Sequence, residues 1–159
     1  MSGSRVRSVG VISDTHGRLR PEAVVALRGV DAIVHAGDIG TPDVLERLGA
    51  IAPVTAVRGN NDRGAWAEKV PSTQVLEIGG VLLYVLHDVT ALGLDPRAAG
   101  FGVVISGHSH QPRQEERDGV LFFNPGSAGP RRFKLPVAVG RLTVEDGRVR
   151  GRILELPNE

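Results

Sequence analysis

The 159-residue sequence contains no cysteine, which excludes disulfides, thiolate-ligated zinc and cysteine nucleophiles. Any metal site must therefore use nitrogen and oxygen ligands. Aromatic residues make up only 4% of the chain, so aliphatic side chains must build the core. No segment approaches the ~20 apolar residues of a membrane-spanning helix. The first apolar run ends at Asp14, too soon for a signal peptide, and we therefore expect a cytoplasmic protein without membrane association.

An excess of charge of one sign is also missing. Nineteen basic residues stand against 18 acidic ones, which gives a formal net charge of +1. This balance gives no electrostatic reason to expect general nucleic-acid binding. The 41% hydrophobic content is typical of a globular protein, and the length predicts a single domain over residues 1–159. The sequence leaves homo-oligomer formation open.

The first half of the chain alternates between expected strands and helices. Apolar runs predict strands over residues 6–12, 31–35 and 52–57. Helices are expected from Pro21 to about Leu27 and from Pro42 to about Leu48, because proline is tolerated in the first helical turn. Thr41 is the expected N-cap of the second helix. This order predicts right-handed βαβ units and a parallel sheet.

After Trp66 the pattern changes to strands joined by tight turns. Gly79-Gly80, Asp118-Gly119 and the residues around Gly147 predict antiparallel hairpins, so the second half is expected to be mainly antiparallel. The expected strands cover residues 73–78, 81–86, 101–105, 114–117, 120–123, 138–144 and 148–156, with a short helix near 95–99. Together these elements predict an α/β fold, a four-layer αββα sandwich of two mixed sheets with helices outside.

Short polar stretches follow the apolar runs, and they contain four of the five histidines. The stretches are Asp14-Thr15-His16, Gly37-Asp38, Gly59-Asn60-Asn61-Asp62, His87-Asp88 and Gly107-His108-Ser109-His110. Ligands of open α/β sheets bind at the C-terminal ends of the strands, and imidazole and carboxylate are common ligands of transition metals. An isolated His-x-His would be read as ordinary loop residues, but five such stretches predict a metal site at this edge.

The motifs Asp-x-His, Gly-Asp, Gly-Asn-x-Asp, a lone histidine and Gly-His-x-His, in this order, resemble those of the calcineurin-like metallophosphoesterases. The small size and the turn at residues 124–127 (Asn-Pro-Gly-Ser) resemble the single-domain bacterial and archaeal phosphodiesterase branch. The resemblance covers nearly the whole chain. It implies that two divalent ions are held, the first by Asp14, His16 and His110, the second by Asn60, His87 and His108, with Asp38 bridging both.

The resemblance also implies the reaction, hydrolysis of small phosphodiesters by a metal-bridging hydroxide, with catalytic roles for His16, Asp38 and Asn60. Two ions about 3.5–4 Å apart acidify a water and clamp the phosphoryl oxygens. A donor set without thiolate suits manganese, which we favour, with nickel, iron, zinc or magnesium as alternatives. Asn61 and Arg131 are the expected substrate contacts.

Two positions depart from the family pattern. In the larger phosphatases a histidine follows the Gly-Asn pair and is thought to protonate the leaving group, but Asn61 stands here, and an amide is no useful acid. Asp88 replaces the usual glycine after the lone histidine, and it could crowd the site, support His87 or add a ligand. His35 is expected to be structural, in support of the ligands.

A protein of a different class provides the alternative. The retromer scaffolding subunit has the fold implied here and binds partner proteins without useful catalysis, but its metal set is incomplete. All seven expected ligand positions are filled in this chain, which favours a metal-dependent phosphoric diester hydrolase. A nuclease would need a basic groove or an added domain, and the near-neutral charge argues against it.

Overall fold

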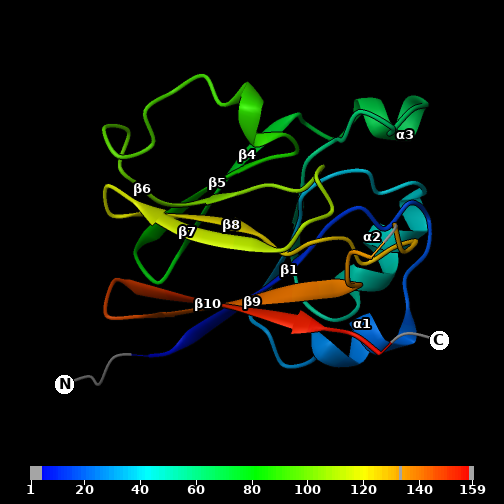
Figure 1. Ribbon diagram of the computed structural model, residues 1–159, viewed down its shortest axis with the longest axis horizontal. Coiled ribbons are helices and arrows are strands. Elements are labelled where there is room, and N and C mark those ends of the chain that lie inside the picture. Colours follow the sequence, from blue (N-terminus) through cyan, green and yellow to red (C-terminus); the bar gives the residue numbers. More distant parts are fainter. Residues whose placement is uncertain (1–4, 133, 158–159) are drawn as a thin grey trace.

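The computed structural model, which describes residues 5–132 and 134–157, contains two five-stranded mixed sheets (Figure 1). The first sheet has the order β10–β9–β1–β2–β3, and its strands are β1 (Arg7–Ile12), β2 (Ala32–His35), β3 (Val54–Ala56), β9 (Ala138–Glu145) and β10 (Arg148–Glu155). Strands β1, β2 and β3 are parallel, and β9 and β10 are antiparallel to their neighbours. The parallel centre expected for this sheet is confirmed.

The second sheet has the order β4–β5–β6–β8–β7. Its strands are β4 (Thr73–Ile78), β5 (Val81–Leu86), β6 (Phe101–Ile105), β7 (Arg113–Arg117) and β8 (Val120–Asn124). The expectation that this half is mainly antiparallel is wrong for the sheet's centre, where β5, β6 and β8 are parallel. The hairpin turns identify β4 with β5 and β7 with β8 as antiparallel pairs, but a turn carries no information about strands joined by longer crossovers.

The two longer helices are α1 (Pro21–Ala26) and α2 (Pro42–Gly49), close to their expected bounds. Two short elements, α3 (Ala65–Glu68) and the 3₁₀-helix η1 (Val89–Ala91), were not expected. The helix expected near 95–99 is only a single turn: Asp95 Oδ1 caps it by accepting the backbone N–H groups of the two residues after Pro96, the Ala99 N–H donates to the Asp95 carbonyl (3.0 Å), and Gly100 then turns the chain into β6 at φ 88°. No helix within the described residues is long and apolar enough to cross a membrane.

Three apolar clusters define the layers. One lies between the first sheet and helices α1 and α2, and includes Ile12, Leu27 and Ile33. The second fills the space between the two sheets. The third is smaller, consists of Leu86, Val104 and Val120 with partly buried neighbours, and lies on the outer face of the second sheet. The expected α/β sandwich of two mixed sheets is therefore confirmed, with a thin outer layer over the second sheet.

The Phe123 ring joins the two sheets through two glycines. Phe123 is buried in β8, and a Cβ atom added to Gly140 of β9 would lie 2.4 Å from its ring. A Cβ added to Gly151 of β10 would lie 2.8 Å from the same ring. These glycines are therefore needed for space, because the aromatic side chain already fills the volume that an alanine methyl would occupy.

We expect Gly140→Ala to lower the free energy of unfolding by ~1–3 kcal/mol, the usual cost of overpacking a core. Urea denaturation measures it. Gly93→Ala is the control, because a Cβ at Gly93 meets no heavy atom within 4 Å. The cost should shrink in a Phe123→Leu background, which opens the space that the ring fills. An equal cost in both backgrounds would show that the ring is not the cause.

Candidate metal centre

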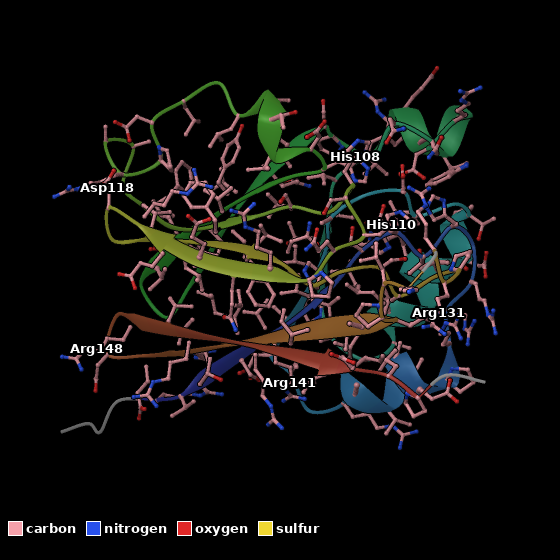
Figure 2. The ribbon with its side chains drawn as sticks, in the orientation of Figure 1. His108, His110, Asp118, Arg131, Arg141 and Arg148 are labelled. Atoms are coloured by element: carbon pink, nitrogen blue, oxygen red, sulfur yellow. The ribbon has the colours of Figure 1, made fainter. Side chains whose placement is uncertain are left out.

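The expected ligands lie at the C-terminal ends of their strands, where backbone hydrogen bonds continue from loop to loop. The N–H of Asp14 donates to the Gly37 carbonyl at 2.9 Å, and the N–H of His16 donates to the Asp38 carbonyl at the same distance. Figure 2 shows His108 and His110 at the end of the molecule opposite to the Asp118 hairpin turn. The predicted position of the site, at one edge of the sheets, agrees with this arrangement.

Five expected ligands have left-handed backbones. Among the described residues other than glycine, seven have positive φ, and five of them are Asp14 (57°), His16 (49°), Asp38 (56°), His108 (71°) and His110 (64°). Such conformations cost of order 1–3 kcal/mol each and persist only where the surroundings enforce them. The remaining two are aspartates in hairpin turns, Asp118 and Asp146, where positive φ is ordinary. The strain is therefore concentrated at the candidate site.

The first group of ligand atoms comes from Asp14, His16 and His110. Asp14 is fully buried, and its Oδ2 accepts hydrogen bonds from the Ser13 hydroxyl (2.6 Å) and the His108 N–H (3.1 Å). Its Oδ1 has no hydrogen-bond partner and lies 3.3 Å from His110 Nε2. His16 Nε2 and His110 Nδ1 also lack partners. Leaving buried polar atoms unpaired costs ~1–3 kcal/mol each, so this donor set fits a bound divalent cation.

A second group combines Asp14 and Asp38 with His87. His87 Nδ1 lies 2.7 Å from the Ala36 carbonyl, which can only accept, so Nδ1 carries a proton, and in the neutral ring Nε2 has a lone pair that faces the site. Nε2 lies 3.4 Å from Asp38 Oδ2 and 3.9 Å from Asp14 Oδ1. Burial alone lowers the pKa of His87, but the hydrogen bonds with Asp38 and Ala36 and the carboxylate charges raise it overall.

Asp38 lies between the two groups. Its Oδ2 is 3.4 Å from His87 Nε2 and 3.8 Å from His16 Nε2. Asn61 donates to both oxygens, through its backbone N–H to Oδ1 (2.9 Å) and through its amide to Oδ2 (3.0 Å). Burial raises the pKa of Asp38, but the contacts with His87 and Asn61 outweigh it and hold this pKa well below its usual range. Asp38 is therefore ionised and lies near a histidine of each group, and its role as a bridging ligand stays a prediction.

The remaining expected residues lie further out. Asn60 is exposed in the loop between β3 and α3. His108 is half-exposed, and its Nδ1 lies 3.3 Å from His87 Nε2. Arg131 is exposed, and its Nε donates to the Leu135 carbonyl of its own loop (3.4 Å). The roles of Asn60 as ligand and of Asn61 and Arg131 as substrate contacts stay predictions.

Asp88 has a structural role next to the site. Its Oδ1 accepts hydrogen bonds from the backbone N–H and the hydroxyl of Thr90, and so begins η1. The hydrogen bond from the Thr90 hydroxyl is the main cause of the lowered pKa of Asp88. Its Oδ2 lies 3.8 Å from His108 Nε2. This contact with His108 is none of the three roles that the sequence left open for Asp88, which were crowding the site, supporting His87 and adding a ligand.

Two buried polar residues hold the ligand loops, and sequence reasoning did not assign them this role. Asp62 accepts backbone N–H groups from Ile39 (3.1 Å), Gly40 (2.9 Å) and Gly59 (2.9 Å), so it ties two loops together. Asn124 donates to the Gly107 carbonyl (2.9 Å) and to Ser109 Oγ (3.1 Å), and so fixes the histidine loop. The sequence signal for Asn124 was the Asn-Pro-Gly-Ser turn, which was used only as a family resemblance.

His35 is fully buried behind the ligands, as its expected structural role requires. Its Nδ1 accepts the Gly37 N–H (3.1 Å), so the proton of the neutral ring is on Nε2, which lies 3.0 Å from Thr15 Oγ1. The Thr15 hydroxyl in turn donates to the Ile39 carbonyl (2.8 Å). Burial lowers the pKa of His35 to about 4, although nearby carboxylates such as Asp14 oppose the shift. His35 is therefore neutral at physiological pH.

We expect stability to fall with His35 protonation as the pH drops from 6.5 to 4. The unfolded chain takes up this proton near pH 6.5, whereas the folded chain takes it up only near pH 4. Between these values the unfolded state binds more protons, and roughly 3 kcal/mol of stability is lost. Urea denaturation in EDTA at several pH values measures the slope, which should be shallower in His35→Gln. Equal slopes would contradict the neutral buried ring.

We expect Mn²⁺ to stabilise the protein and EDTA to reverse this. An ion at about 100 times its dissociation constant that binds only the folded state adds ~2.7 kcal/mol. Thermal melting should show the shift in the wild type and lose it in Asp14→Asn, which removes the charge shared by both groups. Asp146→Asn is the matched control, since this aspartate is also left-handed but lies in the turn between β9 and β10. A shift that survives Asp14→Asn would place the ion elsewhere.

The chain is similar in sequence to known phosphoesterases. The family model described as the calcineurin-like phosphoesterase superfamily domain matches residues 8–147. A probable metallophosphoesterase from Methanothermobacter thermautotrophicus is 40% identical over 134 residues, which cover 75% of this chain and 76% of that protein. Neither match assigns a substrate.

Two solved structures with different names have folds similar to that of this chain. A structure described as a novel archaeal phosphodiesterase has a TM-score of 0.75 and 25% identity, over 92% of this chain and 99% of that chain. Vps29 from Entamoeba histolytica, solved in complex with zinc, has a TM-score of 0.70 and 23% identity, over 94% of this chain and 98% of that chain. The second likeness shows the fold alone, so it is compatible with the scaffold alternative without favouring it.

Proposed function

Because the chain belongs to the calcineurin-like phosphoesterase superfamily, we propose that it is a phosphodiesterase that hydrolyses small phosphodiesters with two divalent ions, manganese favoured. The observation that carries this proposal is the pair of ligand groups that share Asp14, in which three buried polar atoms lack hydrogen-bond partners. These atoms belong to Asp14, His16 and His110. A scaffold that used this edge only for packing would gain nothing from leaving them unpaired.

The ligands divide between the two ions as follows. Asp14, His16 and His110 would hold the first ion, His87, His108 and Asn60 would hold the second, and Asp38 would contribute to both. When bound, the two ions supply an acidified water and positive charge for the phosphoryl oxygens. The neutral Asn60 leaves the site more positive than an aspartate would, which favours binding of a phosphate anion.

The surrounding residues orient these ligands and set their protonation. Ala36 fixes the tautomer of His87, and Asn61 keeps Asp38 in one orientation through two hydrogen bonds. Of the first group, His16 is the most exposed ligand, at 26%, so its ring borders the open side from which a substrate reaches the site. It is the ligand best placed to contact charge that develops on a phosphoryl oxygen.

Leaving-group protonation limits the choice of substrate. Asn61 is an amide whose side chain is already bonded to Asp38, and His35 is buried and neutral behind the ligands. Neither residue can act as a general acid, which is typically worth ~100- to 10,000-fold in rate. Aryl diesters, whose phenolate leaves without a proton, are therefore the appropriate test substrates.

A test of catalysis distinguishes a phosphodiesterase from a protein-binding scaffold better than a test of ion binding does. The zinc complex of Vps29 shows that a protein named for vacuolar sorting also binds an ion. Metal analysis alone would therefore leave the scaffold alternative open. Turnover of a diester that depends on the shared carboxylates would not.

We expect the Mn²⁺-loaded protein to hydrolyse bis(p-nitrophenyl) phosphate and Asp38→Asn to lose this activity. Asp38 contacts both groups, so its loss should cost more than the ~10- to 100-fold typical of an outer-shell partner. Release of p-nitrophenolate measures turnover, circular dichroism checks the fold, and Asp146→Asn is the control. If the wild type binds Mn²⁺ but does not hydrolyse the diester with Mn²⁺, Ni²⁺, Fe²⁺, Zn²⁺ or Mg²⁺, the scaffold alternative holds.

A further inference from the structure

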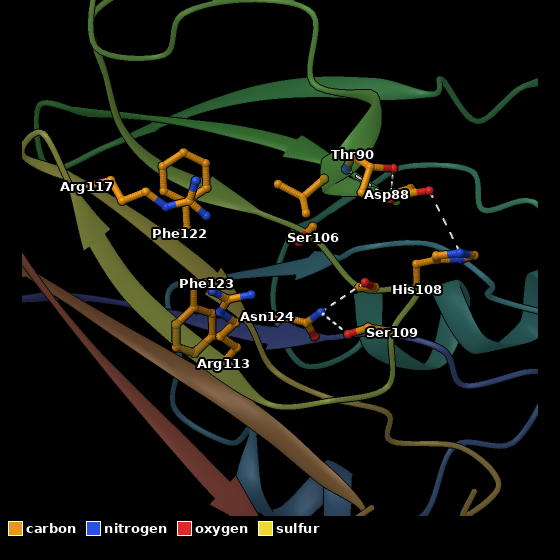
Figure 3. Close-up of a pocket in the computed structure, with 12 residues that line it drawn as sticks. Asp88, Thr90, Ser106, His108, Ser109, Arg113, Arg117, Phe122, Phe123 and Asn124 are labelled. Atoms are coloured by element: carbon orange, nitrogen blue, oxygen red, sulfur yellow. Dashed lines mark hydrogen bonds and ion pairs between the residues drawn. The ribbon is translucent and has the colours of Figure 1, made fainter.

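A pocket of about 280 Å³ opens beside His108 on the outer face of the second sheet (Figure 3). Phe122, Arg113 and Arg117 line one side, and η1 with Asp88 lines the other. The pocket is close to the lower limit of the ~300–1,000 Å³ usual for small-molecule sites. It therefore has room for a single ring system with its attached groups.

The pocket exists because the outer layer of the fold is thin at this place. The Glu115–Phe122 pair of β7 and β8 puts their side chains on one face of the sheet. Arg113 and Arg117 lie two residues either side of Glu115, and they share that face. Within the described residues no helix covers this row, so the face of Phe122 and the two guanidinium groups line an open recess.

The chemistry of this wall favours a flat, electron-rich partner. The Arg117 guanidinium stacks over the Phe122 ring, 4.5 Å from its centroid. Glu115 pairs with both arginines, through contacts of 2.6 Å to Arg113 and 3.3 Å to Arg117. One carboxylate thus orients two cations on this wall, and Asp88 provides a second negative charge on the opposite side of the pocket. Guanidinium planes stack on aromatic rings and donate to oxygen and nitrogen acceptors at the ring edge.

His108 joins this pocket to the candidate metal centre. Its Nδ1 lies 3.3 Å from His87 Nε2 on the metal side, and its Nε2 lies 3.8 Å from Asp88 Oδ2 on the pocket side. His108 and Asp88 both line the pocket. A phosphoryl group held at the metal centre would therefore have one of its ester groups at the end of the recess that His108 lines, and an ester group that extends along β7 towards Val120 would approach Arg117.

We propose that this pocket binds an ester group of the phosphodiester and selects a planar aromatic ring, which stacks on the Arg117–Phe122 pair and accepts a hydrogen bond from Arg113. This assignment rests on the proposed function for the presence of a phosphoryl group at the metal centre. It adds a substrate class, aryl or nucleoside phosphodiesters over alkyl ones. It also gives β7, the edge strand that begins three residues after His110, a role in specificity.

Phenylphosphonate and methylphosphonate provide the test, because they share the phosphoryl group and differ only in the ring. Titration calorimetry of the Mn²⁺-loaded protein should show phenylphosphonate binding about 5- to 150-fold more tightly, the range measured for stacking one base. Arg117→Gln should reduce this ratio towards one, and Phe122→Leu should do the same if it folds. Arg150→Gln, on β10 of the other sheet, is the control and should keep the ratio.

A ratio near one in the wild type, or a ratio that Arg117→Gln leaves unchanged, overturns the pocket assignment. Thymidine 5′-phosphate as a third probe separates a nucleoside from a plain aryl group, because it should bind more tightly than phenylphosphonate only if the recess is built for a base. Binding is measured without turnover, so a lack of hydrolysis would count against the proposed function and leave the pocket result readable. Absence of binding by all three probes overturns the pocket assignment as well.

Discussion

The structure depends on backbone hydrogen bonds that continue after the strands have ended. Asp14 and His16 donate to the carbonyls of Gly37 and Asp38, so the loops after β1 and β2 run side by side in register. A loop buried at this depth must pair its N–H and C=O groups, and Asp62 completes the pairing by accepting three amides. The left-handed backbones of the ligands follow from this requirement. Their side chains can converge because the surrounding hydrogen bonds hold the backbone at positive φ, a conformation that a loop without these bonds would rarely adopt.

The strands were predictable where one physical signal dominated. The apolar run Phe101–Ile105 became β6 with the expected bounds, and Gly79-Gly80 became a hairpin turn with both φ angles positive. The parallel pairing of β5, β6 and β8 was missed because crossover connections leave no local mark, whereas hairpin turns do. The segment 95–99 looked helical by composition, but Asp95 stabilised a turn and Gly100 ended it. The left-handed Gly100 therefore limits this segment to one capped turn.

The candidate site was also predictable from the sequence only in part. The order of the motifs was enough to predict that Asp14, His16 and His110 come together, and the structure brings them together. Sequence could not separate the role of Asp38 from that of Asp62, since each is an aspartate in a glycine-bearing loop after a strand. Only the position of their partners separates them: backbone amides occupy the Asp62 oxygens, whereas histidines surround Asp38. The pocket beside His108 could not be predicted either, because it depends on how little of the chain covers the outer face of the second sheet.

The ligand groups take residues from both halves of the sandwich. Asp14 follows β1 in the first sheet but accepts the N–H of His108, which follows β6 in the second. His87 follows β5 but donates to the Ala36 carbonyl beyond β2. A cation bound here would act as a clasp between the sheets, and thermodynamic reciprocity then requires that whatever tightens the sheet interface also tightens ion binding. The packing of the Phe123 ring on Gly140 and Gly151, although outside the site, would then be coupled to ion binding.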